Sequence, residues 1–294
     1  MHEIISRRKM VYGLAGGGAA AAAWSMAERP AAAGAEDSAP LKGRINHSAC
    51  RWCYGQFSLD DLCKAAKEIG LGAIDLVGPK DWPILAKYGL VCAMGNGAEL
   101  GLTKGFNRLE FHDKLVENYE KLIPAAAAAG VPNVICFSGN RDGLDDAEGI
   151  RNCALGLKRL MKLAEEKKVN VVMELLNSKR DHKDYQCDHT AWGVALCKQV
   201  GSERFKLLYD IYHMQIMEGD LIATITQNLE YIAHFHTGGV PGRHEIDQTQ
   251  EIYYPAVMKA IADRGFKGYV AQEFIPKQAD ALESLRRCVR ICDV

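Results

Sequence analysis

The sequence predicts a single (β/α)8 barrel (TIM barrel) preceded by an N-terminal signal segment. Short apolar runs alternate with longer amphipathic stretches, and about eight such pairs fit into residues 41–294. Several of the apolar runs are continuous, which is typical of parallel strands buried on both faces. The alternative is an open doubly wound sheet, but no Gly-x-Gly-x-x-Gly follows the first apolar run.

The elements follow from the local patterns. In chain order, we expect strands at 44–49, 73–77, 91–96, 133–138, 170–177, 206–213, 232–237 and 268–275. We expect helices at 58–70, 81–88, 109–129, 145–168, 190–199, 220–228, 254–264 and 280–292. Pro124 lies inside the third helix, which predicts a kink or a break there, because proline removes a helical hydrogen bond.

The composition suits a globular protein and leaves small, neutral or mildly anionic ligands open. The chain has 294 residues, of which 48% are hydrophobic and 25% are charged. Residues 41–294 contain no linker or repeat, so we expect one domain there. The formal net charge of −1 provides no basic surface for nucleic acid. No apolar run has the length and hydrophobicity of a typical membrane span.

Residues 1–35 are expected to be a signal peptide and disordered segment rather than part of the fold. Arg7 and Arg8 precede a weakly apolar stretch rich in Gly and Ala, and small residues follow at 31–35. The Ser-Arg-Arg-Lys context resembles a twin-arginine signal. It predicts a twin-arginine translocation partner and a periplasmic or otherwise exported protein. The alternative is a chance arginine pair before a disordered tail.

The ten cysteines are scattered through a large chain, which does not favour a disulfide framework. Most lie in apolar segments, where cysteine is an ordinary small core residue. Cys50 and Cys53 form a lone Cys-x-x-Cys, which permits a redox or zinc role but favours a structural one. The twin-arginine resemblance implies export after folding, so reduced cysteines and a metal acquired in the cytoplasm are consistent with it.

Four polar residues stand where successive expected strands end: Glu174, Asp210, His236 and Glu273. The C-terminal ends of barrel strands meet at one rim, so these side chains are expected to lie together. Three carboxylates and an imidazole suit a divalent metal, and two glutamates can also move protons. Each residue alone could be a structural polar group, but burying several unpaired carboxylates would be costly without a counter-charge.

Strand alternation decides which neighbours share the site. His234 and His236 lie on the same face of one expected strand, and His236 is nearer the rim. We therefore prefer His236 as the metal ligand and His234 as a buried, hydrogen-bonded residue. Asp210 and His213 are three positions apart and would face opposite ways on a regular strand. Both reach the rim only if the chain leaves strand geometry after Asp210, and we expect that it does.

These residues belong to longer matching stretches, which include Glu174-Leu-Leu-Asn177, Tyr209-Asp210-Ile-Tyr-His213-Met-Gln215, His234-Phe-His236, Pro241-Gly242-Arg243-His244-Glu245 and Gln272-Glu273. Through them the chain resembles the xylose isomerase-like barrel superfamily, and within it the hydroxypyruvate isomerases. In metal-dependent relatives such as ketose 3-epimerases, the ligands match Glu174, Asp210, His236 and Glu273. The substrate-binding residues of these relatives match His213 and Arg243. Hydroxypyruvate isomerases usually have Gln at the position of His236, and His is the epimerase-like residue.

The resemblance implies an isomerase that interconverts hydroxypyruvate, or a related small keto acid, with its aldehyde isomer. Glu174 and Glu273 would be the catalytic pair in an enediolate proton transfer, and Mg or Mn would be the divalent metal cofactor. Two alternatives remain: a ketose 3-epimerase or sugar isomerase, and a non-catalytic carbohydrate-binding barrel. The expected partner is a small keto acid or sugar, and a homo-oligomer is compatible with this reading.

Overall fold

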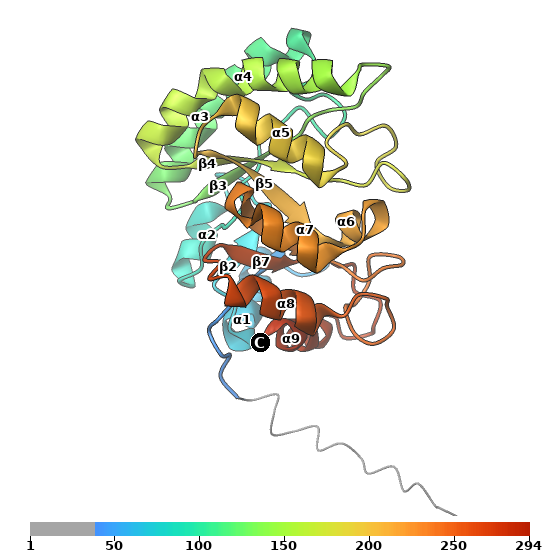
Figure 1. The fold of residues 1–294 in the computed structure, drawn as a ribbon. Helices are drawn as coiled ribbons and strands as arrows, with labels where there is room; N and C mark the ends of the chain where they lie inside the picture. The colour runs from blue at the N-terminus through green and yellow to red at the C-terminus, as the bar shows by residue number, and fades with distance from the viewer. Residues whose placement is uncertain (1–38) are drawn as a thin grey trace, which may run out of the picture. The chain divides into compact units, whose positions relative to one another are not determined.

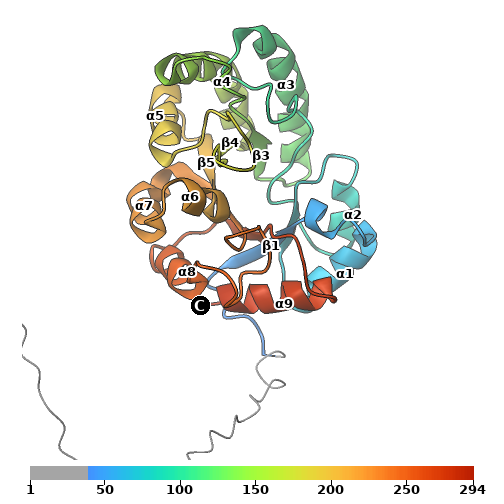
Figure 2. The same cartoon turned by 90° about the vertical axis from the view of Figure 1, so that its right-hand side faces the viewer.

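The computed structural model describes residues 39–294, so the signal segment expected at 1–35 lies outside the described residues. Within the described part, a seven-stranded parallel sheet has the order β2-β1-β7-β6-β5-β4-β3. The strands are β1 (Asn46–Cys50), β2 (Ala73–Asp75), β3 (Asn133–Cys136), β4 (Asn170–Glu174), β5 (Phe205–Asp210), β6 (Ile232–Thr237) and β7 (Tyr269–Gln272). The helices surround these strands as an outer ring (Figures 1 and 2).

The third strand that we expected forms only isolated bridges, yet it closes the ring between β2 and β3. The bridges join Ala73 to Val91, Val77 to Gly95, and Gly95 to Val134. Regular pairing is interrupted because Leu76 has a positive φ of 58°. Gly95 is also closely packed, since a Cβ there would lie 3.1 Å from the Trp82 ring, which would have to shift slightly. The (β/α)8 barrel is therefore confirmed, with one irregular strand where we expected a regular one.

The helices begin and end where the sequence provides caps. They are α1 (Leu59–Ile69), α2 (Trp82–Lys87), α3 (His112–Ala128), α4 (Asp146–Lys167), α5 (Thr190–Val200), α6 (Ile211–Met217), α7 (Leu221–Asn228), α8 (Tyr254–Asp263) and α9 (Ala281–Cys292). The Ser58 hydroxyl accepts a hydrogen bond from the Asp61 N–H at the start of α1, and Asp145 caps α4 in the same way. Helix α3 continues through Pro124, so of the kink or break expected there, a break is excluded.

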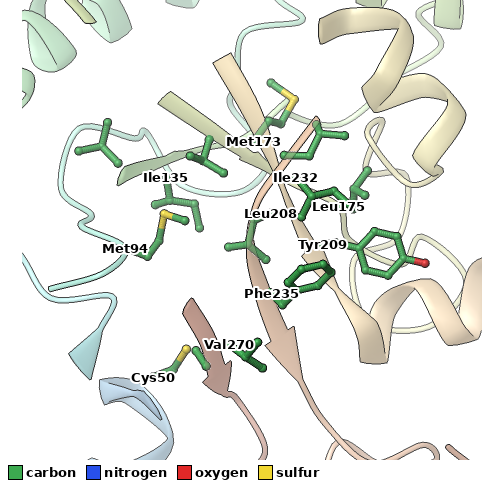
Figure 3. Close-up of a cluster of buried hydrophobic side chains, with 14 of the residues drawn as sticks. Cys50, Met94, Ile135, Met173, Leu175, Leu208, Tyr209, Ile232, Phe235 and Val270 are labelled. Atoms are coloured by element: carbon green, nitrogen blue, oxygen red, sulfur yellow. The ribbon is translucent and has the colours of Figure 1, made fainter. Parts of the chain in front are cut away.

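The core lies between the strands and the ring of helices. Figure 3 shows part of it, with Met173, Phe235 and Val270 coming from three strands of the sheet. All ten cysteines are free and buried, as expected of core residues in a reduced chain. Among the described residues, no helix is both long and apolar enough to cross a bilayer.

Candidate active site

The four polar residues at the strand ends meet at one point of the barrel rim. Glu174 is the last residue of β4, Asp210 the last of β5, and Glu273 follows β7 directly. His236 lies on β6 opposite Asp210, because the two residues are register partners. One potential ligand atom from each residue lies within 4.8 Å of the others, and all four side chains are buried. The arrangement expected from the sequence is therefore present.

His236 lies at the centre of this cluster. Its Nδ1 is 2.6 Å from a Glu273 carboxylate oxygen and 3.2 Å from Glu174 Oε1. Neither His236 Nδ1 nor Glu174 Oε1 has a hydrogen-bond partner of acceptable geometry, although both atoms are buried. The carboxylates thus approach the imidazole without good hydrogen-bond geometry, and such a group of buried acidic oxygens needs a positive charge among them. The oxygen-rich donor set with one imidazole suits Mg or Mn, which these residues could hold.

Arg243 enters the same cluster from the loop after β6. Its Nη2 is 3.0 Å from Asp210 Oδ2 and 2.5 Å from Glu273 Oε2. Its guanidinium lies over two aromatic rings, 5.5 Å from the Trp52 centroid and 5.1 Å from that of Tyr212. The Arg243 side chain is only 13% exposed, so its charge is matched mainly by these carboxylates rather than by water.

The acidic groups have different electrostatic surroundings. Burial raises the pKa of the Glu174 carboxyl despite the opposing effect of His236, and the charge of Glu273 raises it further. Burial also raises the pKa of Asp210, to about 7, against the effect of Arg243. Burial disfavours the ionised form of Glu273 too, but the charges of His236 and Arg243 outweigh it and hold the pKa of this carboxyl well below its usual range. Two carboxyls whose pKa values are pushed apart are typical of an acid–base pair.

His213, expected to bind substrate, is completely buried behind Arg243. Arg243 Nη1 lies 2.9 Å from His213 Nε2, and the Asn177 amide lies 2.6 Å from the other ring nitrogen. The arginine and the Asn177 Nδ2 group are both donors, so the two contacts disfavour a protonated ring. Burial and the Arg243 charge lower the pKa of His213 accordingly. His182, which we did not single out, lines the cavity instead, with its ring 5.1 Å from the His213 ring.

A cavity of about 350 Å³ opens above the cluster. Glu174, Glu273 and Arg243 form its polar floor. Its remaining lining comes largely from the first half of the barrel: Trp52, Leu76, Asn96, Glu99, Gly101, Leu102, Ile135 and Phe137. Trp52 also donates a hydrogen bond from its indole N–H to Glu273 Oε1 at 2.6 Å. Trp52 was not among the residues expected at the site, because it lies in a short helical turn after β1 and not at the end of a strand.

A second polar group lies deeper in the barrel, below His236. His234 Nε2 is 2.7 Å from Asp75 Oδ2, and Ser48 donates a hydrogen bond to the same oxygen at 3.1 Å. His234 is thus buried beside a carboxylate as expected, but neither of its ring nitrogens forms the hydrogen bond that we also expected. On the far side of His236, the Cys50 sulfur lies 3.6 Å from Nε2. No local sequence pattern could predict this contact, since Cys50 lies 186 positions from His236.

The fold and the rim cluster define an α/β barrel in which three carboxylates and one imidazole converge at the C-terminal ends of the strands. The chain belongs to the xylose isomerase-like TIM barrel family, whose family model matches residues 63–291.

Individual relatives within this family differ in their named activities. Hydroxypyruvate isomerase from Escherichia coli K12 is 29% identical over 153 residues, which are 52% of this chain and 58% of that protein. D-psicose 3-epimerase from Ruminiclostridium cellulolyticum is 31% identical over 121 residues, or 40% of this chain and 38% of that protein. Among solved structures, 3-keto-D-glucoside 4-epimerase from Escherichia coli has a TM-score of 0.70 at 16% identity, covering 83% of this chain and 97% of that one. The sequence relatives support an isomerase or epimerase, and the structural match supports the fold.

Proposed function

We propose that this protein isomerises or epimerises a small carbonyl compound by moving a proton at a carbon next to the carbonyl group. One observation carries the proposal: Glu174, Asp210, His236 and Glu273 converge within 4.8 Å, and two of them form the floor of the cavity. Glu174 and Glu273 come from β4 and from the end of β7, so they can approach a bound substrate from different sides.

The chain's own residues supply the proton transfer. One glutamate removes the proton from the carbon, the carbonyl electrons move onto oxygen to give an enediolate, and the other glutamate returns a proton. A divalent ion held by Glu174, Asp210, His236 and Glu273 would stabilise the negative charge on the substrate oxygens. Arg243 lies beside the same floor and would bind a substrate oxygen or carboxylate.

Two substrate classes fit this chemistry. A keto acid such as hydroxypyruvate is suggested by the isomerase relative and by the presence of Arg243. However, the Arg243 charge is already matched by Asp210 and Glu273, and Glu99 adds another acidic group to the cavity lining. A cavity of about 350 Å³ also exceeds what a three-carbon acid fills, since such volumes suit larger ligands. The geometry therefore favours a neutral keto sugar over hydroxypyruvate.

The test is exchange of solvent deuterium into substrate. The protein is incubated in D₂O with Mg or Mn, either with hydroxypyruvate or with each of a panel of free ketoses. We expect deuterium at the carbon next to the carbonyl of a ketose. Turnover of hydroxypyruvate with strong sensitivity to Arg243→Lys would instead assign the keto acid, because lysine cannot reproduce a paired carboxylate contact. Binding of sugars without exchange into any of them would indicate a carbohydrate-binding barrel.

We also propose that the protein is exported through a twin-arginine signal. The support is the order of charged, apolar and small residues in the segment 1–35, together with a described chain whose cysteines are all free.

A further inference from the structure

We propose that the end of β1, which supplies none of the four residues of the rim cluster, supplies two positioning residues for it: Cys50 orients His236, and Trp52 orients Glu273. The inference deepens the metal site of the proposed function and rests on it. It concerns how the ligands are held in place, not which residues the ligands are.

The register of the sheet places the end of β1 beside the cluster. Strands β1 and β7 are parallel, and Ala49 is the register partner of Gln272. The next residue on each strand is Cys50 and Glu273, so these two residues lie at the same level of the barrel. Cys50 and Glu273 are both buried, and together with His236 they offer ligand-type atoms within 4.8 Å of one another.

The turn that follows β1 is held by its own hydrogen bonds. The short helical turn Arg51–Tyr54 carries Trp52 toward the cavity. The Arg51 guanidinium donates to the Tyr54 carbonyl at 2.6 Å and to the Phe57 carbonyl at 2.9 Å. A turn that is tied at both of these carbonyls is a firm support for side chains that position others.

Cys50 acts on His236 through the ring nitrogen that faces away from the carboxylates. Nδ1 lies 2.6 Å from Glu273 Oε2 and 3.2 Å from Glu174 Oε1, so Nδ1 is the nitrogen that would bind an ion held by the cluster. A neutral imidazole that binds an ion through Nδ1 carries its proton on Nε2. The Cys50 sulfur lies 3.6 Å from Nε2 and would accept this hydrogen bond. Such a partner fixes both the tautomer and the orientation of a metal-binding histidine.

Trp52 acts on Glu273 through one carboxylate oxygen. The indole N–H donates to Oε1 at 2.6 Å, while Oε2 lies 2.6 Å from His236 Nδ1. An indole nitrogen can only donate, so Trp52 occupies Oε1 and keeps Oε2 directed at the cluster. Trp52 is 47% exposed, so burial alone does not account for its position. Its bond to Glu273 and its contact with Arg243 do.

The first measurement is the affinity of the full chain for Mn²⁺ by electron paramagnetic resonance, without any substrate. Cys50→Ala removes the acceptor, and Trp52→Phe removes the indole N–H but keeps an aromatic ring. We expect each variant to bind Mn²⁺ about 10- to 100-fold more weakly than the wild type, the usual effect of losing a residue that orients a ligand.

Two matched variants are the controls. Cys153→Ala removes another buried cysteine, in α4, and Trp192→Phe removes an indole N–H that has no hydrogen-bond partner among the described residues. Both controls should bind Mn²⁺ as the wild type does. Wild-type affinity in either Cys50→Ala or Trp52→Phe, or equal weakening in the controls, would overturn the proposal.

Cys50→Ser separates the hydrogen bond from packing. A serine hydroxyl can accept from the His236 Nε2–H, whereas alanine cannot. We therefore expect Cys50→Ser to bind Mn²⁺ more tightly than Cys50→Ala, although a polar hydroxyl in this buried position does not favour stability. Equal affinity of the two variants would show that Cys50 acts only through its volume, which would overturn its role in orienting His236.

The second measurement uses the wild type, so it stands even if a variant does not fold. Nitrogen NMR of the Mg²⁺-loaded protein should show the His236 proton on Nε2, and the Trp52 indole N–H should exchange slowly with solvent despite its exposure. A proton on Nδ1 of His236, or a Trp52 N–H that exchanges as fast as in the unfolded chain, would overturn this inference alone. Failure of the wild type to bind Mn²⁺ or Mg²⁺ would overturn the metal site of the proposed function as well.

Discussion

Asp210 accepts a hydrogen bond at 3.2 Å from the backbone N–H of His213, three residues further along the chain. The same oxygen accepts from the Tyr212 N–H at 2.8 Å, so Asp210 ends β5 and caps α6 at once. Its other oxygen is left for Arg243 and the rim cluster. One side chain thus starts the helix that carries His213 and contributes to the candidate metal site.

The roles of the two Asp210 oxygens, capping α6 and contributing charge to the rim cluster, can be distinguished by substitution. Asp210→Asn keeps an acceptor for the helix cap but removes the charge, whereas Asp210→Ala removes both. We expect both variants to lose activity, and Asp210→Ala to be less stable than Asp210→Asn by about 1 kcal/mol, the usual worth of a cap. Urea unfolding of the two variants, with the wild type as reference, measures the difference. Equal stability would show that the cap contributes nothing.

The glutamate pair should control the rate. Glu174→Gln and Glu273→Gln keep the size of each side chain but cannot accept the substrate proton. We expect a loss of about 10²–10⁴-fold in kcat for each, which is typical of removing a positioned acid or base. Glu110→Gln, on the exposed surface, is the matched control. Near-normal deuterium exchange by either site variant would exclude that residue from the proton transfer.

Metal removal tests the cluster independently of substitution. Dialysis against a chelator should abolish activity, and added Mg or Mn should restore it, because the three carboxylates need a counter-charge to stabilise an enediolate. Dialysis without chelator is the control. Full activity of exhaustively metal-free protein would refute the metal role and leave the two-glutamate relay standing.

His47 should make stability depend on pH. Burial lowers the pKa of this histidine to about 4, although Asp293 opposes the effect. Above pH 6.5 the ring is neutral in both states; as pH falls from 6.5 to 4, the unfolded chain binds a proton that the folded chain does not. We expect stability to fall over this window by up to about 3 kcal/mol, and His47→Gln to flatten the slope. The half-exposed His189, replaced by Gln, is the control, and an unchanged slope in His47→Gln would contradict the assignment.

Export is tested by replacing Arg7 and Arg8 with lysine. If the segment is a twin-arginine signal, the double variant should remain in the cytoplasm, while Arg29→Lys is exported normally. Cell fractionation and blotting measure the distribution. Unchanged periplasmic delivery of the double variant would rule out this route.

The fold and the positions of the rim residues could be predicted because both follow from local patterns. Apolar runs reveal buried parallel strands, and a polar residue at the end of such a run marks the barrel rim. Even the departure from strand geometry after Asp210 followed from the spacing to His213, and the structure confirms it as the start of α6. The irregular third strand was not predictable, because the positive φ of Leu76 on the neighbouring segment leaves no mark in the apolar pattern.

Contacts between residues far apart in the chain leave no local pattern in the sequence, so they could not be predicted from it. Trp52 bonds to Glu273 across 221 positions, and Cys50 approaches His236 across 186. Arg243 was identified by resemblance, but its pairing with Asp210 and Glu273 depends on the path of the loop after β6. Such contacts are decided by packing in three dimensions, whereas strand and helix periods are decided by neighbours in sequence.

The residues that line the cavity come from both halves of the barrel, and the two halves contribute different kinds of side chain. The rim residues that would carry the chemistry come from β4 to β7, while the upper walls come mostly from the segments around β1 to β3, including Leu76, Ile135 and Phe137. Trp52 belongs to the same wall and also bonds to Glu273, so it links the two halves. Under the proposed function, substitutions at Leu76, Ile135 or Phe137 are therefore the ones that would alter substrate range while the proton transfer is kept.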